Sequence, residues 1–507
     1  MDFGLALLSG AFLALSFPKF GHPAFAWIAL APLLVAVAHR PQSMRRAFTL
    51  GLLTGAVYFA GTLYWLVDTM TTFGGLSTPL AAVAAALLIA YLSLFPALFA
   101  VAQSRLVNAL GRGALFAAPF IWIASEMGRT YILDGFPWEL LGYSQAGVLP
   151  IAQLASVVGV YGLSGFVAMV SAAAAYATLA RGPGRWRAVA GVLAIVVLVG
   201  LWGALRVRAS VLTHEGTPIR VAVLQGNILQ DQKWDPAMAG PIMQRYVDLS
   251  REAIGRGAQF LIWPESATPR PYEESLASGD AIRRLAREAK VTLLVGSDQV
   301  EPVRPVDQAR PQTRYYNAAY LIQPDGSIGA IYRKIHLVPF GEYVPFTRLL
   351  FFVKPIVEAV SDFSPGTEPL LLPVAGHQAS TAICYEVIFS SLMRDFVEHG
   401  SELLTTITND SWYGVSSAAH QHWQQASLRT IEQGRYLARA ANTGISGFID
   451  PYGRVLQQSN LFESTVLTED VRFLTGRTIY SRIGDVVGWL SVAFTIAALV
   501  ATRRKVR

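Results

Sequence analysis

The stretch AQFLIWPES, residues 258–266, decides the fold. Its apolar residues run without a polar interruption into Trp-Pro-Glu, which is typical of a short strand that ends at a turn. A strand without polar alternation indicates a sheet that is buried on both of its faces. Glu265 would then lie at the carboxyl edge of that sheet, where open α/β sheets bind their ligands.

Other short apolar runs predict further strands around this one. Four helical patterns each precede one of the strands, and strands that alternate with helices indicate an α/β fold. The sequences QPDG and DPYG are turn signals that are expected to close hairpins. Together these features predict one α/β domain over residues 217–475. The other predicted strands are 219–227, 291–298, 317–322, 380–386, 402–410 and 444–453, and the predicted helices are 243–256, 280–290, 391–399 and 424–441.

The rest of the chain has the composition of a membrane protein. Hydrophobic residues make up 53% and charged residues only 15% of the 507 residues, whereas soluble chains carry about 25% charged residues. The apolar excess predicts a membrane domain of seven transmembrane helices over residues 1–206 and an eighth over 484–502. The first helix lacks a basic start and a cleavage site, so it is expected to be retained. The apolar windows are 3–16, 24–38, 47–67, 79–102, 114–125, 151–179, 188–205 and 486–500.

The distribution of Lys and Arg predicts how the chain crosses the membrane. If eight helices alternate from a cytoplasmic N-terminus, twelve Lys and Arg residues fall in inside loops and the inside tail, against two in short outside loops. Inside loops of membrane proteins carry this excess of positive charge. Both termini are therefore expected in the cytoplasm, and residues 217–475 on the outer face of a bacterial inner membrane, in the periplasm. The net charge of +7 is then explained by orientation, and no basic stripe with interleaved aromatic residues indicates nucleic-acid binding.

Three predicted strand ends carry residues that suit nucleophilic catalysis. Glu265 ends the first quoted stretch, Lys334 lies in IYRKIHLVPFGEYVP, and Cys384 ends the strand in STAICYE. A thiolate is a nucleophile, a carboxylate can act as its base, and an ammonium can stabilise an oxyanion. Cys384 is also the only cysteine in the chain, so it cannot be locked in an intramolecular disulfide in an oxidising compartment.

Each of these residues also has a simpler interpretation. A lone cysteine is most often a small buried hydrophobe, Glu265 could cap a following helix, and Lys334 alone could be a solvated charge. His420 and His422 in HQHW resemble a metal pair, but no acidic or cysteine partner is close in the sequence, and no metal or other cofactor is predicted. Asp298 and Asp410 are expected to be turn or cap residues.

The order and separation of WPE, YRKIHLVPFGEYVP and ICYE resemble the carbon–nitrogen hydrolase (nitrilase) superfamily. This resemblance implies an α-β-β-α sandwich with a Glu–Lys–Cys triad. The triad would comprise Glu265 as general base, Lys334 in oxyanion stabilisation and Cys384 as nucleophile, and a further carboxylate of the family would be Glu342. Separately none of these motifs is specific, but jointly they are.

Apolar helices, an external nitrilase-like domain and one last helix resemble the apolipoprotein N-acyltransferase family over the whole chain. The resemblance implies an enzyme that moves an acyl chain from a phospholipid, typically the sn-1 position of phosphatidylethanolamine, to the N-terminal amine of a diacylglyceryl-cysteine apolipoprotein. It also implies that Trp234, Tyr385, Glu386 and Trp412 lie around the active site. Trp234 and Trp412 could equally be core aromatic residues.

Three further expectations concern the lipid route and the competing functions. The apolar segment 345–360, with Phe351 and Phe352, could be a lid at the lipid entrance or an ordinary packed helix. A membrane-tethered amidase or nitrilase would use the same triad with water as second nucleophile, and a transporter or receptor would instead place ionisable residues mid-membrane. The sequence leaves the oligomeric state open: soluble nitrilase-like enzymes often assemble, whereas a membrane-mounted one could be a monomer.

Overall fold

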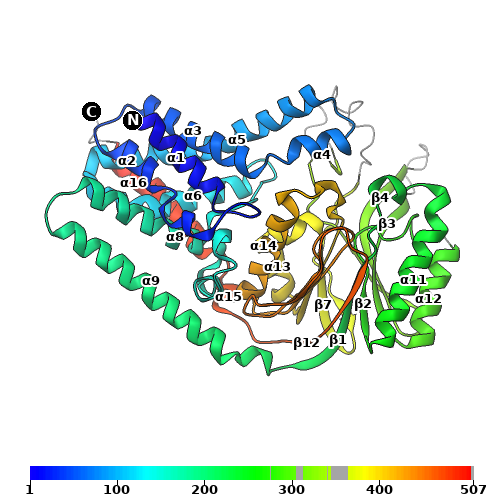
Figure 1. Ribbon diagram of the computed structural model, residues 1–507. Coiled ribbons are helices and arrows are strands. Elements are labelled where there is room, and N and C mark those ends of the chain that lie inside the picture. The colour runs from blue at the N-terminus through cyan, green and yellow to red at the C-terminus, as the bar shows by residue number, and fades with distance from the viewer. Residues whose placement is uncertain (275, 304–311, 340, 344–362, 504–507) are drawn as a thin grey trace.

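The computed structural model describes residues 1–274, 276–303, 312–339, 341–343 and 363–503. Helices form one end of the molecule, and strands with their covering helices form the other (Figure 1). The division agrees with the predicted change from an apolar to an α/β part near residue 206.

Two six-stranded sheets build the α/β part. In each sheet three neighbouring strands are parallel, β1-β2-β3 in one and β7-β8-β9 in the other, and antiparallel strands extend them. The first sheet has the order β12 (Thr465–Phe473), β1 (Thr217–Gln225), β2 (Phe260–Ile262), β3 (Thr292–Val303), β4 (Gln312–Ile322) and β5 (Ile328–Arg333). The second has the order β11 (Val455–Gln458), β10 (Gly447–Ile449), β9 (Leu437–Ala441), β8 (Leu403–Thr408), β7 (His377–Ile383) and β6 (Leu372–Val374).

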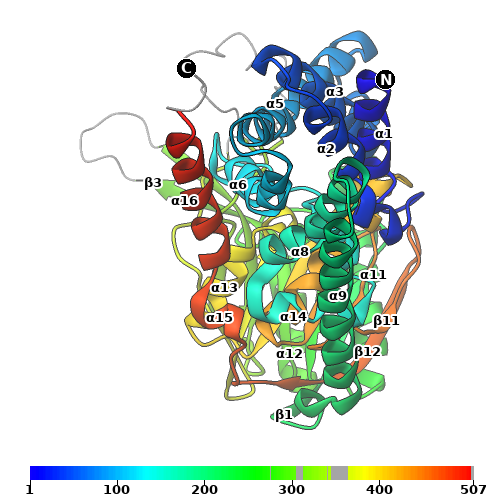
Figure 2. The same ribbon diagram turned by 90° about the vertical axis from the view of Figure 1, so that its left-hand side faces the viewer.

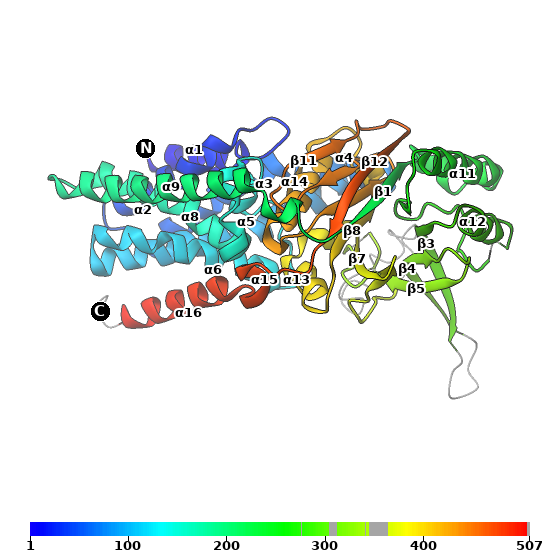
Figure 3. The ribbon, with the colours of Figure 1, turned by 90° about the horizontal axis from the view of Figure 1, so that it is seen from below.

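Alternating side chains of the first sheet enter two different cores. Val221 and Val223 of β1 pack in the core that also contains residues of the second sheet, whereas Ala222 and Leu224 pack with helices on the outer face. Those outer helices are α11 (Ala239–Gly255) and α12 (Leu276–Ala289). On the other side of the molecule, α13 (Ser390–Glu398) and α14 (Ser417–Gln433) cover the second sheet (Figure 3). The predicted α-β-β-α sandwich is confirmed.

Both turn signals lie where they were expected. QPDG joins the antiparallel strands β4 and β5, and DPYG joins β10 and β11. The predicted helix 424–441 is wrong in its second half, because α14 ends at Gln433 and residues Leu437–Ala441 form β9. Gly434 follows the helix with φ of 63°, the left-handed conformation that glycine adopts at helix ends.

The helical part contains apolar helices of very different lengths. By length and composition, three helices of the described chain are able to cross a membrane: α5 (Thr78–Leu110), α8 (Ala155–Leu179) and the helix that starts with α9 (Gly184–Ala209). A fourth crossing is possible if the bent pair α3 (Met44–Thr62) and α4 (Leu66–Thr72) counts as one. The shorter apolar helices are α1 (Asp2–Ala14), the pair η1 (Pro23–Ile28) and α2 (Ala31–Ala38), and α16 (Val486–Ala501). The number of eight crossings remains a prediction.

Two predicted helices are interrupted. The predicted helix 47–67 bends by 51° between α3 and α4. The predicted helix 151–179 is divided into α7 (Leu149–Ala152) and α8, and Gly159 has a non-helical φ of 66° within α8. A Cβ at Gly159 would lie 2.4 Å from the ring of Tyr480, so the close approach of that ring requires glycine.

One of the predicted membrane helices extends further than its hydrophobic pattern indicated. The expected helix 114–125 corresponds to η2 (Arg112–Ala117) and α6 (Ala118–Tyr131), so Glu126 and Arg129 lie inside α6 rather than beyond its end. Both side chains are buried; Glu126 accepts hydrogen bonds from Trp122 and from the backbone N–H of Leu141, at 2.9 and 2.7 Å. Hydrogen bonds within the protein explain why these ionisable residues are tolerated in an apolar helix.

The N-terminus and the C-terminal end of α16 lie on different sides of the helical part (Figure 2), but both are at its end away from the sheets (Figure 3). The α/β part contacts the opposite end through α14, whose first residue, Ser417, bonds to Tyr64. The two parts therefore form one molecule with the sheets at one end and both chain ends at the other.

Candidate active site

Glu265 lies in the turn that follows β2. Trp263 continues the parallel pairing, with its N–H 2.8 Å from the carbonyl of Leu294, and this carries the chain to the edge of the sheet. The Glu265 carboxylate is 6% exposed and accepts hydrogen bonds from Asn317 Nδ2 at 2.7 Å and from the backbone N–H of Asn409 at 2.7 Å. A residue of each sheet thus holds the carboxylate in place between them.

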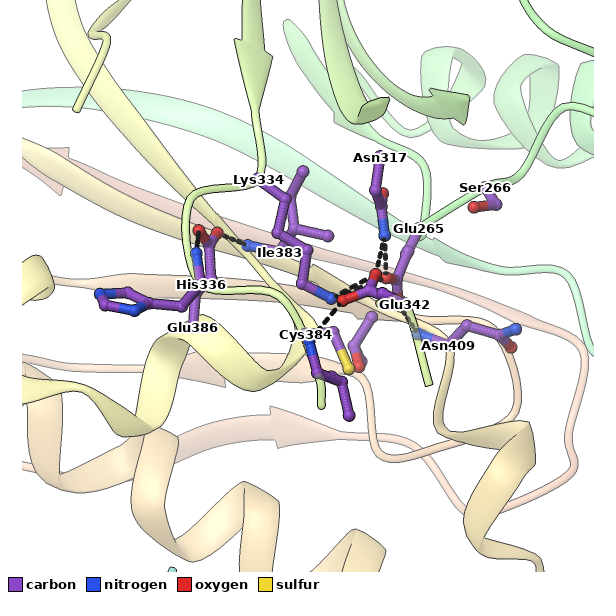
Figure 4. A network of polar contacts seen from close by, with 12 residues as sticks. Glu265, Ser266, Asn317, Lys334, His336, Glu342, Ile383, Cys384, Glu386 and Asn409 are labelled. Atoms are coloured by element: carbon purple, nitrogen blue, oxygen red, sulfur yellow. Dashed lines mark hydrogen bonds and ion pairs between the residues drawn. The ribbon is translucent and has the colours of Figure 1, made fainter. Parts of the chain in front are cut away.

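Lys334 follows β5 and points into the same space (Figure 4). Its Nζ lies 2.8 Å from Glu342 Oε1 and 3.5 Å from Glu265 Oε1, and its side chain is 1% exposed. Burial alone would lower the pKa of Lys334, but the negative charges of Glu342 and Glu265 outweigh it and raise the pKa. Lys334 is therefore a permanent cation in this site.

Glu342 completes a small charge network. Asn317 Nδ2 donates to Glu342 Oε1 at 2.8 Å as well as to Glu265, and the backbone N–H of Val338 donates to Glu342 Oε2 at 2.8 Å. The ammonium of Lys334 and the amide of Asn317 therefore bridge the two carboxylates, which would otherwise repel each other.

Cys384 begins η7 (Cys384–Ile388) directly after β7 and has a positive φ of 53°. The thiol is buried and lies beside Glu265 and Lys334 (Figure 4). Burial raises the pKa of Cys384, the carboxylate of Glu265 raises it further, and Lys334 acts in the opposite direction. The sulfur is thus a neutral thiol at rest, and it needs a base before it can attack an ester.

Glu386 joins the two loops that carry Lys334 and Cys384. It accepts hydrogen bonds from the backbone N–H groups of Ile383, Ile335 and His336, at 2.7, 2.6 and 3.1 Å, and from Tyr332 Oη at 2.9 Å. Burial raises the pKa of Glu386 to about 7, although these N–H groups and Lys334 act to lower it. Glu386 faces away from the sulfur and toward the loop backbone (Figure 4), so its contacts are those of a support.

Comparison with known proteins agrees with this geometry. Residues 9–173 match the family described as apolipoprotein N-acyltransferase N-terminal domain, and residues 220–479 match the carbon–nitrogen hydrolase family. The apolipoprotein N-acyltransferase of Geobacter metallireducens is 39% identical over 99% of this chain and 96% of its own, and that of Methylococcus capsulatus is 37% identical over 95% and 92%. The chain belongs to the apolipoprotein N-acyltransferase family.

The predicted resemblance is thereby confirmed, for the superfamily and for its membrane-bound branch. An amidase of the nitrilase superfamily from Nesterenkonia AN1 has a TM-score of 0.40 at 21% identity, covering 53% of this chain and 94% of its own. All three residues of the predicted triad lie within residues 220–479 of this chain, which match the carbon–nitrogen hydrolase family.

The other residues implied by the resemblance differ in how exposed they are. Tyr385 is buried, with its hydroxyl 3.4 Å from the carbonyl of Gly135 in the helical part. Trp234 and Trp412 are 48% and 39% exposed, so the interpretation of either as a core aromatic is wrong. The Trp412 ring packs edge-on against Phe73, at 5.5 Å between ring centroids.

Three contributors to the site were not predicted. Asn317, inside β4, binds both carboxylates, and the backbone N–H of Asn409 holds Glu265. Lys233, at the end of α10 (Gln230–Lys233), is 4% exposed and lies 3.3 Å from the Glu265 carbonyl oxygen. Burial lowers the pKa of Lys233 to about 8, while the negative charges around it, Glu265 first, act to raise it.

The turn or cap prediction is wrong for Asp298, which lies within β3. Its carboxylate accepts a hydrogen bond from Ser266 at 3.1 Å, and burial raises its pKa to about 6, although Lys233 acts to lower it. Asp410 is the first residue of the turn η8 (Asp410–Tyr413), as predicted, and its buried side chain pairs with Arg439, whose Nη2 lies 2.8 Å from Asp410 Oδ2. The sequence indicated neither side-chain partner, because Ser266 and Arg439 are distant from the aspartates in the sequence.

Two remaining predictions concern a metal and a lid. Among the residues that the structure describes, no group of three or more His, Cys, Asp or Glu residues is arranged to hold a metal ion. The proposed lid segment 345–360, with Phe351 and Phe352, lies outside the described residues.

Proposed function

We propose that this chain transfers an acyl chain from a phospholipid to the N-terminal α-amine of a diacylglyceryl-cysteine apolipoprotein. The family resemblance implies the sn-1 acyl chain of phosphatidylethanolamine as the donor. The observation that carries the proposal is the convergence of the Cys384 thiol, the Glu265 carboxylate and the Lys334 ammonium in one buried space. Family membership supplies the substrate class, and the geometry supplies the chemistry.

In the first half of the reaction, Glu265 accepts the proton of Cys384 and the thiolate attacks the acyl ester carbonyl. Lys334, with backbone amides near the cysteine, stabilises the negative charge of the tetrahedral intermediate. The C–O bond of the ester then breaks, Glu265 returns the proton to the leaving alkoxide, and a lysophospholipid departs. A thioester on Cys384 remains.

In the second half, the amine of the apolipoprotein attacks the thioester carbonyl. Glu265 accepts a proton from the attacking nitrogen, the C–S bond breaks, and the proton returns to the Cys384 sulfur. One product leaves before the second substrate reacts, so the kinetics are ping-pong. Glu342 and Asn317 hold the side chains of Glu265 and Lys334 in position during both halves of the reaction.

The position of the site supports a lipid donor. Tyr143 of η3 (Leu141–Gln145) donates to the carbonyl of Ile388 at 3.1 Å, and Tyr385 contacts Gly135, so the cysteine segment is bonded directly to the helical part. A site beside membrane helices spares a lipid from being lifted into water, which costs about 0.8 kcal/mol for each CH₂ exposed.

We also propose the topology that the Lys and Arg distribution predicts. The apolar helices lie in the bacterial inner membrane, both termini face the cytoplasm, and the α/β part faces the periplasm. The position of both chain ends at the same end of the helical part supports this arrangement (Figure 3).

Reconstitution tests the proposed activity. The purified chain is placed in vesicles of phosphatidylethanolamine labelled in its sn-1 acyl chain, and a diacylglyceryl-cysteine peptide is added. We expect the label on the peptide amine by mass spectrometry, and no transfer by the Cys384→Ala variant. Transfer of no label to the peptide, with hydrolysis of simple amides by the same preparation, would instead establish the tethered amidase.

A further inference from the structure

The HQHW motif remains unexplained by the proposed reaction, although its second histidine lies directly behind the nucleophile. His422 of α14 is fully buried, and its Nε2 lies 3.1 Å from the backbone carbonyl oxygen of Cys384. No other side-chain hydrogen bond to that carbonyl is found within the described residues. His422 is thus the side chain through which the helix layer reaches the nucleophile's backbone.

A buried ion pair holds the other side of the His422 ring. His422 Nδ1 lies 3.0 Å from Arg439 Nη2 and 3.2 Å from Asp410 Oδ1. Arg439 also pairs with Asp410, and Thr408 donates to Asp410 Oδ1 at 2.8 Å. All of these side chains are essentially inaccessible to water, so the ring is held on both edges.

The partners determine which nitrogen of His422 carries the proton. A carbonyl oxygen can only accept, so Nε2 must be the donor to Cys384. At Nδ1, a guanidinium can only donate and a carboxylate can only accept, so Nδ1 accepts from Arg439 in the neutral ring and donates to Asp410 in the protonated one; Nε2 carries a proton in both. Burial and the charge of Arg439 lower the pKa of His422, which agrees with a neutral ring that is protonated on Nε2.

The carbonyl of Cys384 is a sensitive place for such a bond. Cys384 has φ of 53°, a left-handed conformation that is strained for a non-glycine residue. This conformation turns the chain from β7 into η7, and the rotation of the peptide after Cys384 sets the direction of its carbonyl and of the next N–H relative to Sγ. Glu386 holds the preceding turn through Ile383, and His422 holds the carbonyl that follows.

We propose that His422 is a positioning residue that keeps Cys384 in its left-handed, reactive conformation by donating a hydrogen bond to the Cys384 carbonyl. The inference rests on the proposed role of Cys384 as nucleophile, but it concerns the backbone of that residue. His422 touches neither acyl donor nor amine, and it acts only through Cys384.

Variants at His422 separate this role from simple packing. His422→Leu and His422→Phe remove the donor, the second with an aromatic ring of similar size, while His422→Gln restores an N–H near the position of Nε2. We expect the rate constant for thioester formation to fall roughly 10- to 100-fold in the Leu and Phe variants. The apparent KM for phospholipid should stay within about twofold, and Gln should recover much of the rate.

A second readout does not depend on the lipid substrate. The rate at which a small alkylating reagent, iodoacetamide, modifies Cys384 in the folded enzyme should change in the Leu and Phe variants and return toward the wild-type rate in the Gln variant. His420→Leu, in the same motif but partly exposed, is the matched control and should leave both rates unchanged.

Two results would overturn the inference. One is a folded Leu or Phe variant with wild-type thioester and alkylation rates. The other is an equal loss in all three His422 variants that follows their loss of thermal stability, since a purely structural residue would behave so. A third result would separate the two proposals. If the wild-type enzyme forms no thioester, but the alkylation rate of Cys384 still changes in the Leu and Phe variants and recovers in the Gln variant, the proposed function is refuted and this positioning role stays intact.

Discussion

At the scale of single residues, the stability of the site depends on how its buried charges are balanced. Two carboxylates, Glu265 and Glu342, share one ammonium and one amide donor, all of them largely withdrawn from water. Removing one partner from a buried charge network leaves the others uncompensated, which is far costlier than the pair's net contribution. Lys334 therefore has a structural effect that is separable from its catalytic one.

Replacing Lys334 by methionine should destabilise the protein by about 3–5 kcal/mol, because both carboxylates lose their cation. Adding Glu342→Gln removes one of the two stranded charges and should restore part of the lost stability without restoring acyl transfer. Denaturant unfolding of the single and double variants measures their stability, and the transfer assay measures their acyl-transfer activity. A double variant less stable than Lys334→Met would contradict this charge balance.

The pKa of Lys233 leads us to expect that the reaction slows at alkaline pH. Its pKa of about 8 means that it is an ammonium below that pH and neutral above it, where it no longer favours negative charge at Glu265, Asp298 and Cys384. Thioester formation should therefore slow as the pH rises through about 8. In Lys233→Arg, which stays charged, the decline should move to higher pH. An unchanged pH profile in that variant would exclude Lys233 as its source.

The sequence could predict Glu265 and Cys384 because each comes shortly after a recognised strand, and strand ends meet at one edge of a sheet, whereas Lys334 was recognised from its motif. Asn317 lies inside a strand whose pattern indicates only a buried sheet, so nothing local distinguishes it. The local sequence does not distinguish Lys233 from a surface lysine. His422 was examined only for metal, because its true partners, Asp410 and Arg439, belong to other elements.

At the scale of elements, α14 connects the catalytic part to the helical part. Gln421 accepts hydrogen bonds from Trp65 and Trp138 at 3.3 and 2.8 Å, and the next residue, His422, faces Cys384. Near the other end of α14, Glu432 accepts from the backbone N–H of Val160 at 2.8 Å, beside the break in α8. Through these contacts, α14 connects the nucleophile to the apolar helices of the helical part.

The break in α8 should not tolerate a side chain. Gly159→Ala places a Cβ against the ring of Tyr480 and imposes a left-handed φ on alanine, so we expect a loss of about 1–3 kcal/mol in stability. Gly191→Ala in α9 is the matched control. A Cβ at Gly191 would meet no atom within 4 Å outside its own stretch of helix backbone, so this change should be neutral or slightly stabilising. Thermal unfolding in detergent compares the two, and equal midpoints would contradict the account of this break.

Element types were more predictable than element ends. Strands β1 to β4, β7, β8 and β10, the hairpin turns and the apolar helices were recognised because their patterns are local, whereas no strand was predicted at β5, β6, β9 or β12. The helix predicted at 424–441 overran Gly434, since the residues of β9, LARAA, individually favour a helix. The division of 151–179 depends on Tyr480, which lies more than 300 residues away in the chain and leaves no mark on the local sequence.

At the scale of the whole molecule, the arrangement places a water-facing sandwich on a set of apolar helices. The face of α9 is rich in exposed leucine and valine, which suits contact with lipid rather than water. The cysteine segment lies at the junction of the two parts, within hydrogen-bond distance of Tyr143. A lipid ester in the membrane surface would thus be near the thiol.

The single native cysteine makes the orientation directly testable. In a Cys384→Ala background, Arg181→Cys places a thiol in a predicted inside loop and Gln244→Cys places one on the exposed face of α11. A membrane-impermeant thiol reagent applied to the periplasmic side should label the second and spare the first until the membrane is opened. The reverse pattern would contradict the proposed topology.

The central claim is that Cys384 carries the acyl group between donor and acceptor. Intact-protein mass spectrometry after incubation with phosphatidylethanolamine alone tests it most directly. The account predicts an added acyl mass on Cys384 that hydroxylamine or a diacylglyceryl-cysteine peptide removes, and a large decrease in its rate of formation in Glu265→Gln. Transfer of the acyl chain to the peptide at full rate with Cys384 never modified, or by the Cys384→Ala variant, would contradict it.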